Sequence, residues 1–586
     1  MNYEWDLTKI YKSLDDPKFA EDAKALEESV KEYGDYVDSL DSSKAPTVSE
    51  LEKMFELAEK ESLLEYRQFS FLFLSQAVDT ENGRLMGEIN RATRVTSAGA
   101  GTEAKVVKLI SNIEDIDSYA EKSEIINEYK VLLKRKKEAA QHLLTDKEEE
   151  LYASMDMTGG SAWGTLQSFL TSTVKVDYEG DTITLTEARN LAYDENGDVR
   201  KKAYDAEIAS YEKIADSIAY SLNNIKLQVN MISKKRGFES PLMQALNQSY
   251  MTKETLDAML GAIKDHLPNV RKYFLHKAKL LGYDGALNWW DMFAPLGENN
   301  KKYTVEETKE ILTSTFEHFT PEMSDMMREA FDNNWIDFFP RNGKEGGAFD
   351  QGIPFIKESR VMTNFDGSFG SIDTLAHELG HSFHDRQVQN NRILNMDYPM
   401  QVAESASTFN ETFLCNYFVE RAENDSEKVA LLESLLREQT QCVVDIYSRY
   451  LFETSVFEIC DEKFLMKDDL KDLMHKAQVE AYGEGIKEDT LHPYMWACKS
   501  HYYSTGLSFY NFPYAFGALF AAGLYAMFLK EGRETFVPKY KAMLKATPTV
   551  TVEEAGALMG VDLTKKNFWE DSLKIIEKNI EEFCAL

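Results

Sequence analysis

Apolar residues recur at three- and four-residue spacing over most of the chain, which is the pattern of amphipathic α-helices. The clearest stretches are residues 18–40, 48–79, 125–144 and 199–234. Pro17 directly precedes the first of them, where the fixed φ of proline suits a helix start. Proline, the strongest helix breaker, accounts for only 13 of 586 residues. We therefore predict a mostly helical protein.

A first interruption of the helical pattern lies near residue 180. Residues 174–178 and 182–185 alternate between apolar and polar positions on either side of Glu179-Gly180-Asp181, which predicts a β-hairpin. Thr186 is then placed to cap the next helix. We set a domain boundary directly after this hairpin. The predicted domains are a helical N-terminal domain, residues 1–186, and a second domain, residues 187–586.

A second, longer interruption spans residues 339–374 and contains six glycines. Within it, residues 360–365 form a plausible strand that Asp366-Gly367 closes. A glycine-rich, partly extended segment directly before a helix is a place where a functional site can be built.

Composition narrows the function classes. The chain carries 66 Lys and Arg against 99 Asp and Glu, a net charge of -33. Such a chain repels nucleic acid and anionic membranes, so we expect neither as a partner. The five cysteines include no C-x-x-C pair, which argues against disulfides and thiolate metal sites and fits a reducing cytoplasm. The apolar run at residues 514–529 is shorter than the roughly 18 residues of a membrane span, and we interpret it as a buried helix.

The strongest chemical signal is His377-Glu378-Leu379-Gly380-His381. Histidines four residues apart on a helix lie on one face, one turn apart, and can hold one metal ion together. Glu378 then projects beside the ion and can take a proton from the attacking water. The alternative is a helix whose histidines are satisfied by backbone or buried carboxylates.

A catalytic zinc site needs a third protein ligand and an open position. Glu404 lies 23 residues after His381, which allows a loop and a second helix packed on the first. Glu411 follows seven residues later on the same predicted face. There it can accept the N–H of a ligand imidazole and so orient that ring without binding the metal itself. His384 lies three residues after His381, where the zinc motif of metzincins has a glycine, so that motif is absent. We expect a packing or supporting role for His384.

At these residues the sequence resembles the oligoendopeptidase F branch of the thimet oligopeptidase family of zinc metallopeptidases. Residues 377–384 resemble the family's H-E-x-G-H-x-x-H, and Val402-Ala403-Glu404-Ser405-Ala406-Ser407 is similar to its glutamate-ligand segment, with Ala406 in place of a proline. The opening Trp5-Asp6-Leu7, with Tyr11 and Asp15-Asp16-Pro17, and residues 288–296 also resemble that branch.

The resemblance implies two helical lobes enclosing a deep substrate channel, with a small β-sheet near the active site. It implies one Zn²⁺ per chain, held by His377, His381 and Glu404, in a cytoplasmic endopeptidase that cleaves short peptides. Residues 187–586 would then be the catalytic domain.

Peptide hydrolysis also needs donors for the oxyanion. The resemblance implies a late histidine and two tyrosines seven residues apart, which match His501, Tyr503 and Tyr510, with Tyr502 and Tyr514 as rivals. Residues 360–365, with Val361 and Thr363, are expected to pair with the backbone of an extended peptide.

Two other functions remain open. A zinc exopeptidase could use the same motif in a channel closed at one end. A peptide-binding protein with structural zinc is the other, although a structural site has no use for a base at Glu378.

Overall fold

The computed structural model describes residues 3–297 and 301–586 of the chain. It divides into two compact units, each assembled from three segments of the sequence. The first unit comprises Met1–His142, Asn300–Leu414 and Glu531–Met559, and the second comprises Leu143–Asn299, Cys415–Lys530 and Gly560–Leu586. The predicted domains, residues 1–186 and 187–586, are instead continuous in sequence, and this division stays a prediction. Residues 1–2 of the first domain and 298–300 of the second lie outside the described residues.

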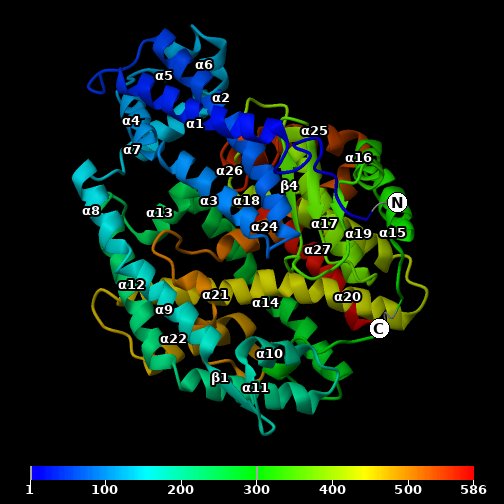
Figure 1. Ribbon diagram of the computed structural model, residues 1–586. Coiled ribbons are helices and arrows are strands. Elements are labelled where there is room, and N and C mark those ends of the chain that lie inside the picture. Colours follow the sequence, from blue (N-terminus) through cyan, green and yellow to red (C-terminus); the bar gives the residue numbers. More distant parts are fainter. Residues whose placement is uncertain (1–2, 298–300) are drawn as a thin grey trace. The chain divides into compact units, whose positions relative to one another are not determined.

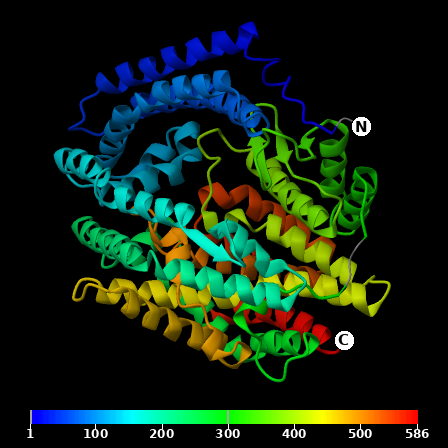
Figure 2. The same cartoon turned by 60° about the horizontal axis from the view of Figure 1, so that its bottom comes forward.

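The first unit is built from helices around one small sheet (Figure 1). Its helices are α1 (Pro17–Asp38), α2 (Val48–Ala77), α3 (Gly83–Ser97), α4 (Ala100–Ser111), α5 (Ile116–Ala120), α6 (Glu124–Glu128), α7 (Lys130–Ala140), α15 (Val305–Glu317), α16 (Pro321–Asp332), α17 (Phe369–Val388), α18 (Met400–Ala403), α19 (Ser407–Val419), α25 (Arg533–Ala546) and α26 (Val552–Met559). Helix α19 continues past the unit boundary at Leu414. Helices α1 and α2 pack side by side, as Figure 2 shows.

The sheet of the first unit has three strands in the order β3-β5-β4. Strands β3 (Ile336–Asp337) and β5 (Glu358–Met362) are parallel, and β4 (Phe349–Ile353) is antiparallel to β5. Helix α17 packs against β4 and β5, so the sheet lies beside the predicted metal motif. This agrees with the expectation of a small sheet near the site.

The start of the chain is fixed to this sheet. Trp5 and Tyr11 belong to a buried apolar cluster that also contains Ile353 of β4 and Met362 of β5. The Arg360 guanidinium on β5 donates to the backbone carbonyl of Asp6 at 2.8 Å. The opening residues therefore serve to support the sheet.

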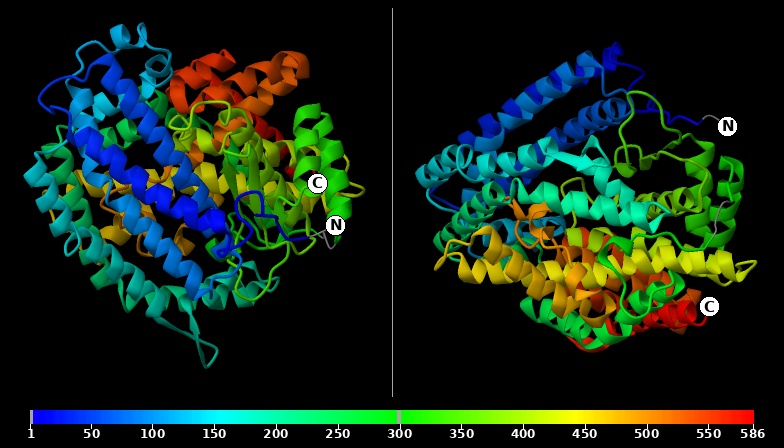
Figure 3. Two further views of the ribbon diagram at one scale, coloured as in Figure 1. Left: turned by 45° about the horizontal axis from the view of Figure 1, so that its top comes forward. Right: turned by 90° about the horizontal axis from the view of Figure 1, so that it is seen from below.

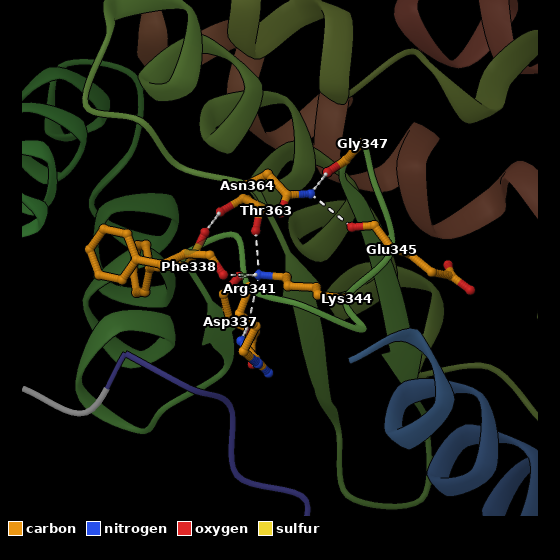
Figure 4. A network of polar contacts seen from close by, with 9 residues as sticks. Asp337, Phe338, Arg341, Lys344, Glu345, Gly347, Thr363 and Asn364 are labelled. Carbon is orange, nitrogen blue, oxygen red and sulfur yellow. Dashed lines mark hydrogen bonds and ion pairs between the residues drawn. The ribbon is translucent and has the colours of Figure 1, made fainter. Parts of the chain in front are cut away.

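Lys344 holds the glycine-rich loop in place (Figure 4). Its ammonium group is fully buried and pairs with the Asp337 carboxylate at 2.7 Å. It also donates to the carbonyls of Phe339 and Thr363. The loop between β3 and β4 is thus attached to the end of β5, where the chain turns toward α17.

The second unit is helical apart from one hairpin. Its helices are α8 (Asp146–Asp156), α9 (Gly160–Thr173), α10 (Leu185–Asn190), α11 (Gly197–Glu212), α12 (Ala215–Lys235), α13 (Pro241–Gln248), α14 (Lys253–Leu280), α20 (Asp425–Thr440), α21 (Ile446–Ile459), α22 (Lys467–Tyr482), α23 (Met495–Cys498), α24 (Phe512–Glu531) and α27 (Lys566–Cys584). Helix α14 packs along α27, and both can be followed in Figure 3. The mostly helical class with small sheets is confirmed.

Helix α24 contains the apolar run. By length and composition it could cross a membrane, but 67% of its most apolar window is buried inside the structure. At Gly523 an added Cβ would come within 2.4 Å of the Phe568 ring of α27. The prediction of a buried helix is confirmed.

Several predicted boundaries need correction. The hairpin is present as β1 (Lys175–Tyr178) and β2 (Asp181–Thr184), but Thr184, not Thr186, caps α10. The stretch at 125–144 divides into α6 and α7 because the backbone at Tyr129 leaves the helical region. The stretch at 199–234 divides into α11 and α12 at Ile214, where φ is -121°. Apolar spacing continues through both breaks, so periodicity alone does not reveal them.

Candidate metal centre

Helix α17 presents the two predicted histidine ligands. Ser368 caps its first turn by accepting from the Ser371 N–H, which fixes where the helix begins. His377 and His381 then lie one turn apart, with ring centroids 4.9 Å from each other. The potential ligand atoms of His377, Glu378 and His381 all lie within 4.8 Å of one another. The structure thus gathers these side chains as the spacing predicted.

Glu404 completes the set from a separate short helix. It ends α18, and its Oε2 lies 3.4 Å from Nε2 of His377 and 3.4 Å from Nε2 of His381. Ligands about 2.0 Å from a tetrahedral zinc ion stand about 3.3 Å apart, so both distances from Glu404 fit such a site. The ligand types and their spacing therefore fit a zinc ion.

Gly380 allows the chain that carries Glu404 to cross α17. An added Cβ at Gly380 would lie 2.6 Å from the Ser407 Cα and 2.7 Å from the Ala406 carbonyl oxygen. Asn410 strengthens the crossing, because its amide donates to the Ala376 carbonyl at 3.0 Å. The predicted continuous helix through Glu404 is wrong, since α18 ends at Ala403 and α19 begins at Ser407.

Glu411 of α19 contacts the first histidine from behind. Its Oε1 lies 2.8 Å from Nδ1 of His377, which leaves Nε2 facing Glu404. Burial alone lowers the pKa of His377, but the hydrogen bond to Glu411 and neighbouring carboxylates raise it to about 9. Burial would raise the pKa of Glu404, but His381, Ser407 and His377 lower it to about 2. The carboxylate is thus held ionised, as a metal ligand must be.

Glu378 lies among these groups and is only 6% exposed. Burial raises the pKa of its carboxyl group, against the opposing effect of His377 and His381. A carboxyl group with a raised pKa is a more effective proton acceptor near neutral pH than an exposed one.

The candidate ligands open onto a cavity of about 760 Å³ within the first unit. Residues 348–352, four of which belong to β4, line this cavity together with Asp385 and Tyr398. Strand β4 is at the edge of the sheet, so one side of its backbone has no strand partner among the described residues. The cavity therefore places a free strand edge beside the candidate ligands.

Two aspartates in the wall were not predicted. Asp385 lies one turn after His381, and Asp350 is on β4, where it accepts a hydrogen bond from Ser382 at 2.6 Å. Burial and their mutual interaction raise the pKa of Asp350, and burial raises that of Asp385. The sequence offers the spacing of Asp385 from His381 as a signal, but nothing in it joins Asp350 to α17.

The structure contradicts the predicted pairing of a peptide with Val361, whereas Thr363 lies past the end of β5 and lines a second cavity with His377 and Glu378. Strand β5 ends at Met362 and is the middle strand, paired on both sides. Val361 is fully buried and its N–H donates to the Trp335 carbonyl, while the Thr363 N–H donates to Asp337. A peptide cannot pair with a strand whose hydrogen bonds are already made.

The predicted oxyanion donors belong to the second unit. His501, Tyr510 and Tyr514 form an aromatic group, with centroid distances of 4.9 Å from His501 to Tyr510 and 5.2 Å from Tyr510 to Tyr514. Tyr503 is buried elsewhere and its hydroxyl donates to the Trp496 carbonyl at 2.8 Å.

Glu453, which sequence reasoning missed, fixes the segment that carries Tyr510. This buried carboxylate pairs with Lys226 at 2.7 Å and accepts from the Phe509 N–H and the Asn511 amide. Phe509 has a φ of 54°, a conformation that these bonds hold in place.

His384 has a packing role, as expected. It is fully buried, its Nε2 lies 2.8 Å from the Thr547 hydroxyl, and it stacks on Tyr398 at 4.2 Å. Burial lowers the pKa of its imidazole to about 3, so the ring stays neutral.

Most of this chain matches the sequence models of known protein families. Residues 190–575 match the sequence model of peptidase family M3. The chain belongs to peptidase family M3. Residues 111–175 also match the N-terminal model described as oligopeptidase F. The predicted resemblance is confirmed, and the M3 protein is a metallo-oligopeptidase with a metal cofactor.

Individual relatives agree with the family. The chain is 27% identical to an oligoendopeptidase F homolog of Lactococcus lactis over 99% of this chain and 97% of that protein. A crystal structure from Chlamydophila abortus has a TM-score of 0.85 at 20% identity, covering 99% and 98% of the two chains. An oligoendopeptidase F structure from Enterococcus faecium has a TM-score of 0.67 at 19% identity, covering 97% and 98%. These two structures support the fold.

We expect Gly380→Ala to destabilise the M3 protein. The new methyl group would force α17 away from the chain at Ser407, at a cost of about 1–3 kcal/mol, and would move Glu404 away from the histidines. Urea unfolding measures the stability. Gly370→Ala is the matched control on the same helix, since its nearest atom would be 3.7 Å away. The crossing argument fails if both variants are as stable as the wild type.

Proposed function

We propose that the M3 protein is a zinc endopeptidase that hydrolyses internal bonds of short peptides in the cytoplasm. One zinc ion per chain would be held by His377, His381 and Glu404. The observation that supports this most is the pair of 3.4 Å distances from Glu404 Oε2 to the two imidazole nitrogens. A bound zinc supplies Lewis acidity to a water molecule and to the peptide carbonyl group.

Glu378 is the proposed general base. Its buried carboxylate lies beside the ligand atoms, takes the proton of the attacking water and then gives a proton to the leaving amine. Glu411 keeps the Nδ1 proton of His377 in place, which fixes the imidazole that faces the metal. Neither role needs movement of α17.

The outer edge of β4 is the proposed binding edge for the peptide. An extended peptide that adds to this strand forms main-chain hydrogen bonds and tolerates many side chains. Residues 348–352 already line the cavity of the metal centre, so a peptide on β4 would pass the base. This replaces β5 as the binding strand.

His501 and Tyr510 are the proposed donors to the oxyanion, with Tyr514 preferred to Tyr503 as the second tyrosine. The hydroxyl group of Tyr503 is already bonded to Trp496, whereas Tyr510 and Tyr514 lie around His501. The donor role of these residues is otherwise supported by the resemblance to family members.

A peptide blocked at both ends tests the proposal. We expect the wild-type protein to cleave an internally quenched peptide of about eight to ten residues at an internal bond. A metal chelator should abolish this cleavage and added zinc should restore it. Cleavage that requires a free terminus would favour an exopeptidase. Tight zinc binding without turnover of either kind of peptide would favour a peptide-binding protein.

A further inference from the structure

The second unit contains a separate cavity of about 460 Å³. It is lined by residues of α10, α11 and α23 and by the five-residue π-helical turn Gln441–Asp445. None of the residues of the proposed metal centre lines it. Single π-helical turns inside α-helices occur often at functional sites, which makes this cavity a candidate for one.

The acidic groups in the cavity wall are already neutralised. Glu207 lies 3.4 Å from the Arg189 guanidinium and 3.5 Å from the His492 imidazole. Asp445 pairs with Arg449 and accepts a hydrogen bond from the Tyr482 hydroxyl at 3.1 Å. These carboxylates therefore have little charge left for a ligand.

Two donors in the wall are unsatisfied. Lys499 lines the cavity, and its ammonium group forms no ion pair or hydrogen bond with the described part of the chain, although the charges of Asp445 and Arg449 act on it. Tyr211 is fully buried, and its hydroxyl has no hydrogen-bond partner of ordinary geometry within the described ranges. A buried polar group without a partner costs free energy, so a ligand that accepts from both groups would be stabilised.

The charges of the wall favour an anion. Arg189, Arg200 and Lys499 line the cavity. Arg200 pairs with Asp291 at 2.8 Å and Arg189 with Glu207 at 3.4 Å, so Lys499 is the cation of these three that has no ion pair. A chain with a net charge of -33 repels anions over most of its surface, so an anion needs a local site of this kind.

We propose that this cavity binds a small ligand through a carboxylate or phosphate group. The Lys499 ammonium, the Arg189 guanidinium and the Tyr211 hydroxyl would donate to its oxygens. Trp289 and Trp290, which also line the cavity, would contact the rest of the ligand. Charged donors make the strongest hydrogen bonds to such oxyanions.

Cys498 provides a direct test of occupancy. Cys498 lines the cavity next to Lys499, and its thiol donates to the Met495 carbonyl at 3.5 Å. A ligand on these donors would cover the thiol and slow its alkylation by iodoacetamide, measured by peptide mass spectrometry on the intact protein. At about ten times its dissociation constant, inorganic phosphate should slow Cys498 labelling about tenfold. Cys584, outside the cavity, should keep its labelling rate.

Acetate at matched ionic strength separates the two ligand classes. Protection by phosphate alone assigns a phosphate-bearing ligand, and protection by acetate alone assigns a carboxylate. Protection by neither anion overturns the proposal. Equal slowing at Cys498 and Cys584 overturns it too, because that result would be a general salt effect.

Variants test which donors act. Lys499→Met should abolish the protection, and Lys499→Arg should keep it. Tyr211→Phe should weaken anion binding about fivefold, the value of one typical hydrogen bond. Lys476→Met, at an exposed position on α22, is the matched control. In this variant the anion should slow Cys498 labelling as much as in the wild type. Full protection in the Lys499→Met variant would overturn the assignment of that donor.

Discussion

Glu378→Gln is expected to reduce the kcat of the M3 protein by about 10³-fold or more while leaving its metal content unchanged. Glutamine has the shape of glutamate but cannot accept a proton from water at neutral pH. The proposed metal ligands are atoms of His377, His381 and Glu404, so this substitution leaves all three in place. Turnover of the blocked peptide and zinc content by emission spectrometry measure the two effects separately.

The control for this variant is Glu310→Gln. Glu310 is an exposed glutamate on α15 in the same unit, so its replacement removes one carboxylate without touching the cavity. It should keep both zinc and turnover. Wild-type kcat in Glu378→Gln would exclude Glu378 as the base. Zinc loss in Glu378→Gln would instead show that its carboxylate supports the metal site.

The sequence predicts the centre of the site because the chemistry is local. His377, Glu378 and His381 lie on one helix, and helical geometry alone places their side chains together. Glu404 could be proposed from the number of ligands that zinc needs. Its actual position depends on the break between α18 and α19 and on the close approach at Gly380. No periodic pattern records such a contact, so the predicted continuous helix was wrong.

Long-range pairing explains the other errors. Residues 360–365 have the composition of a strand, but nothing local says whether that strand lies at an edge or in the middle. The order β3-β5-β4 is decided by the parallel pairing of Ile336 with Val361 and by the antiparallel pairing of β4. The same limit applies to Asp350 and Asp385, which meet only because α17 packs on β4. Glu453 supports the Tyr510 segment from 56 residues away.

Removal of the proposed third ligand, Glu404, should strongly reduce the affinity for zinc. We expect Glu404→Ala to weaken zinc binding by at least about 100-fold, because removing even a supporting contact behind a ligand costs about 10–100-fold. Two imidazoles alone leave the ion without the carboxylate that lies 3.4 Å from both. Dialysis against a competing chelator, followed by measurement of bound zinc, gives the affinity.

Glu411→Gln provides a graded comparison with this variant. It keeps all three ligands but weakens the acceptor that holds Nδ1 of His377 at 2.8 Å, so zinc affinity should fall by about 10–100-fold. Excess zinc should therefore restore turnover in Glu411→Gln but not in Glu404→Ala. Glu310→Ala, the matched control, should bind zinc like the wild type. Equal zinc affinity in Glu404→Ala and Glu310→Ala would exclude Glu404 as a ligand and leave the helix α17 histidines to bind the metal with another group.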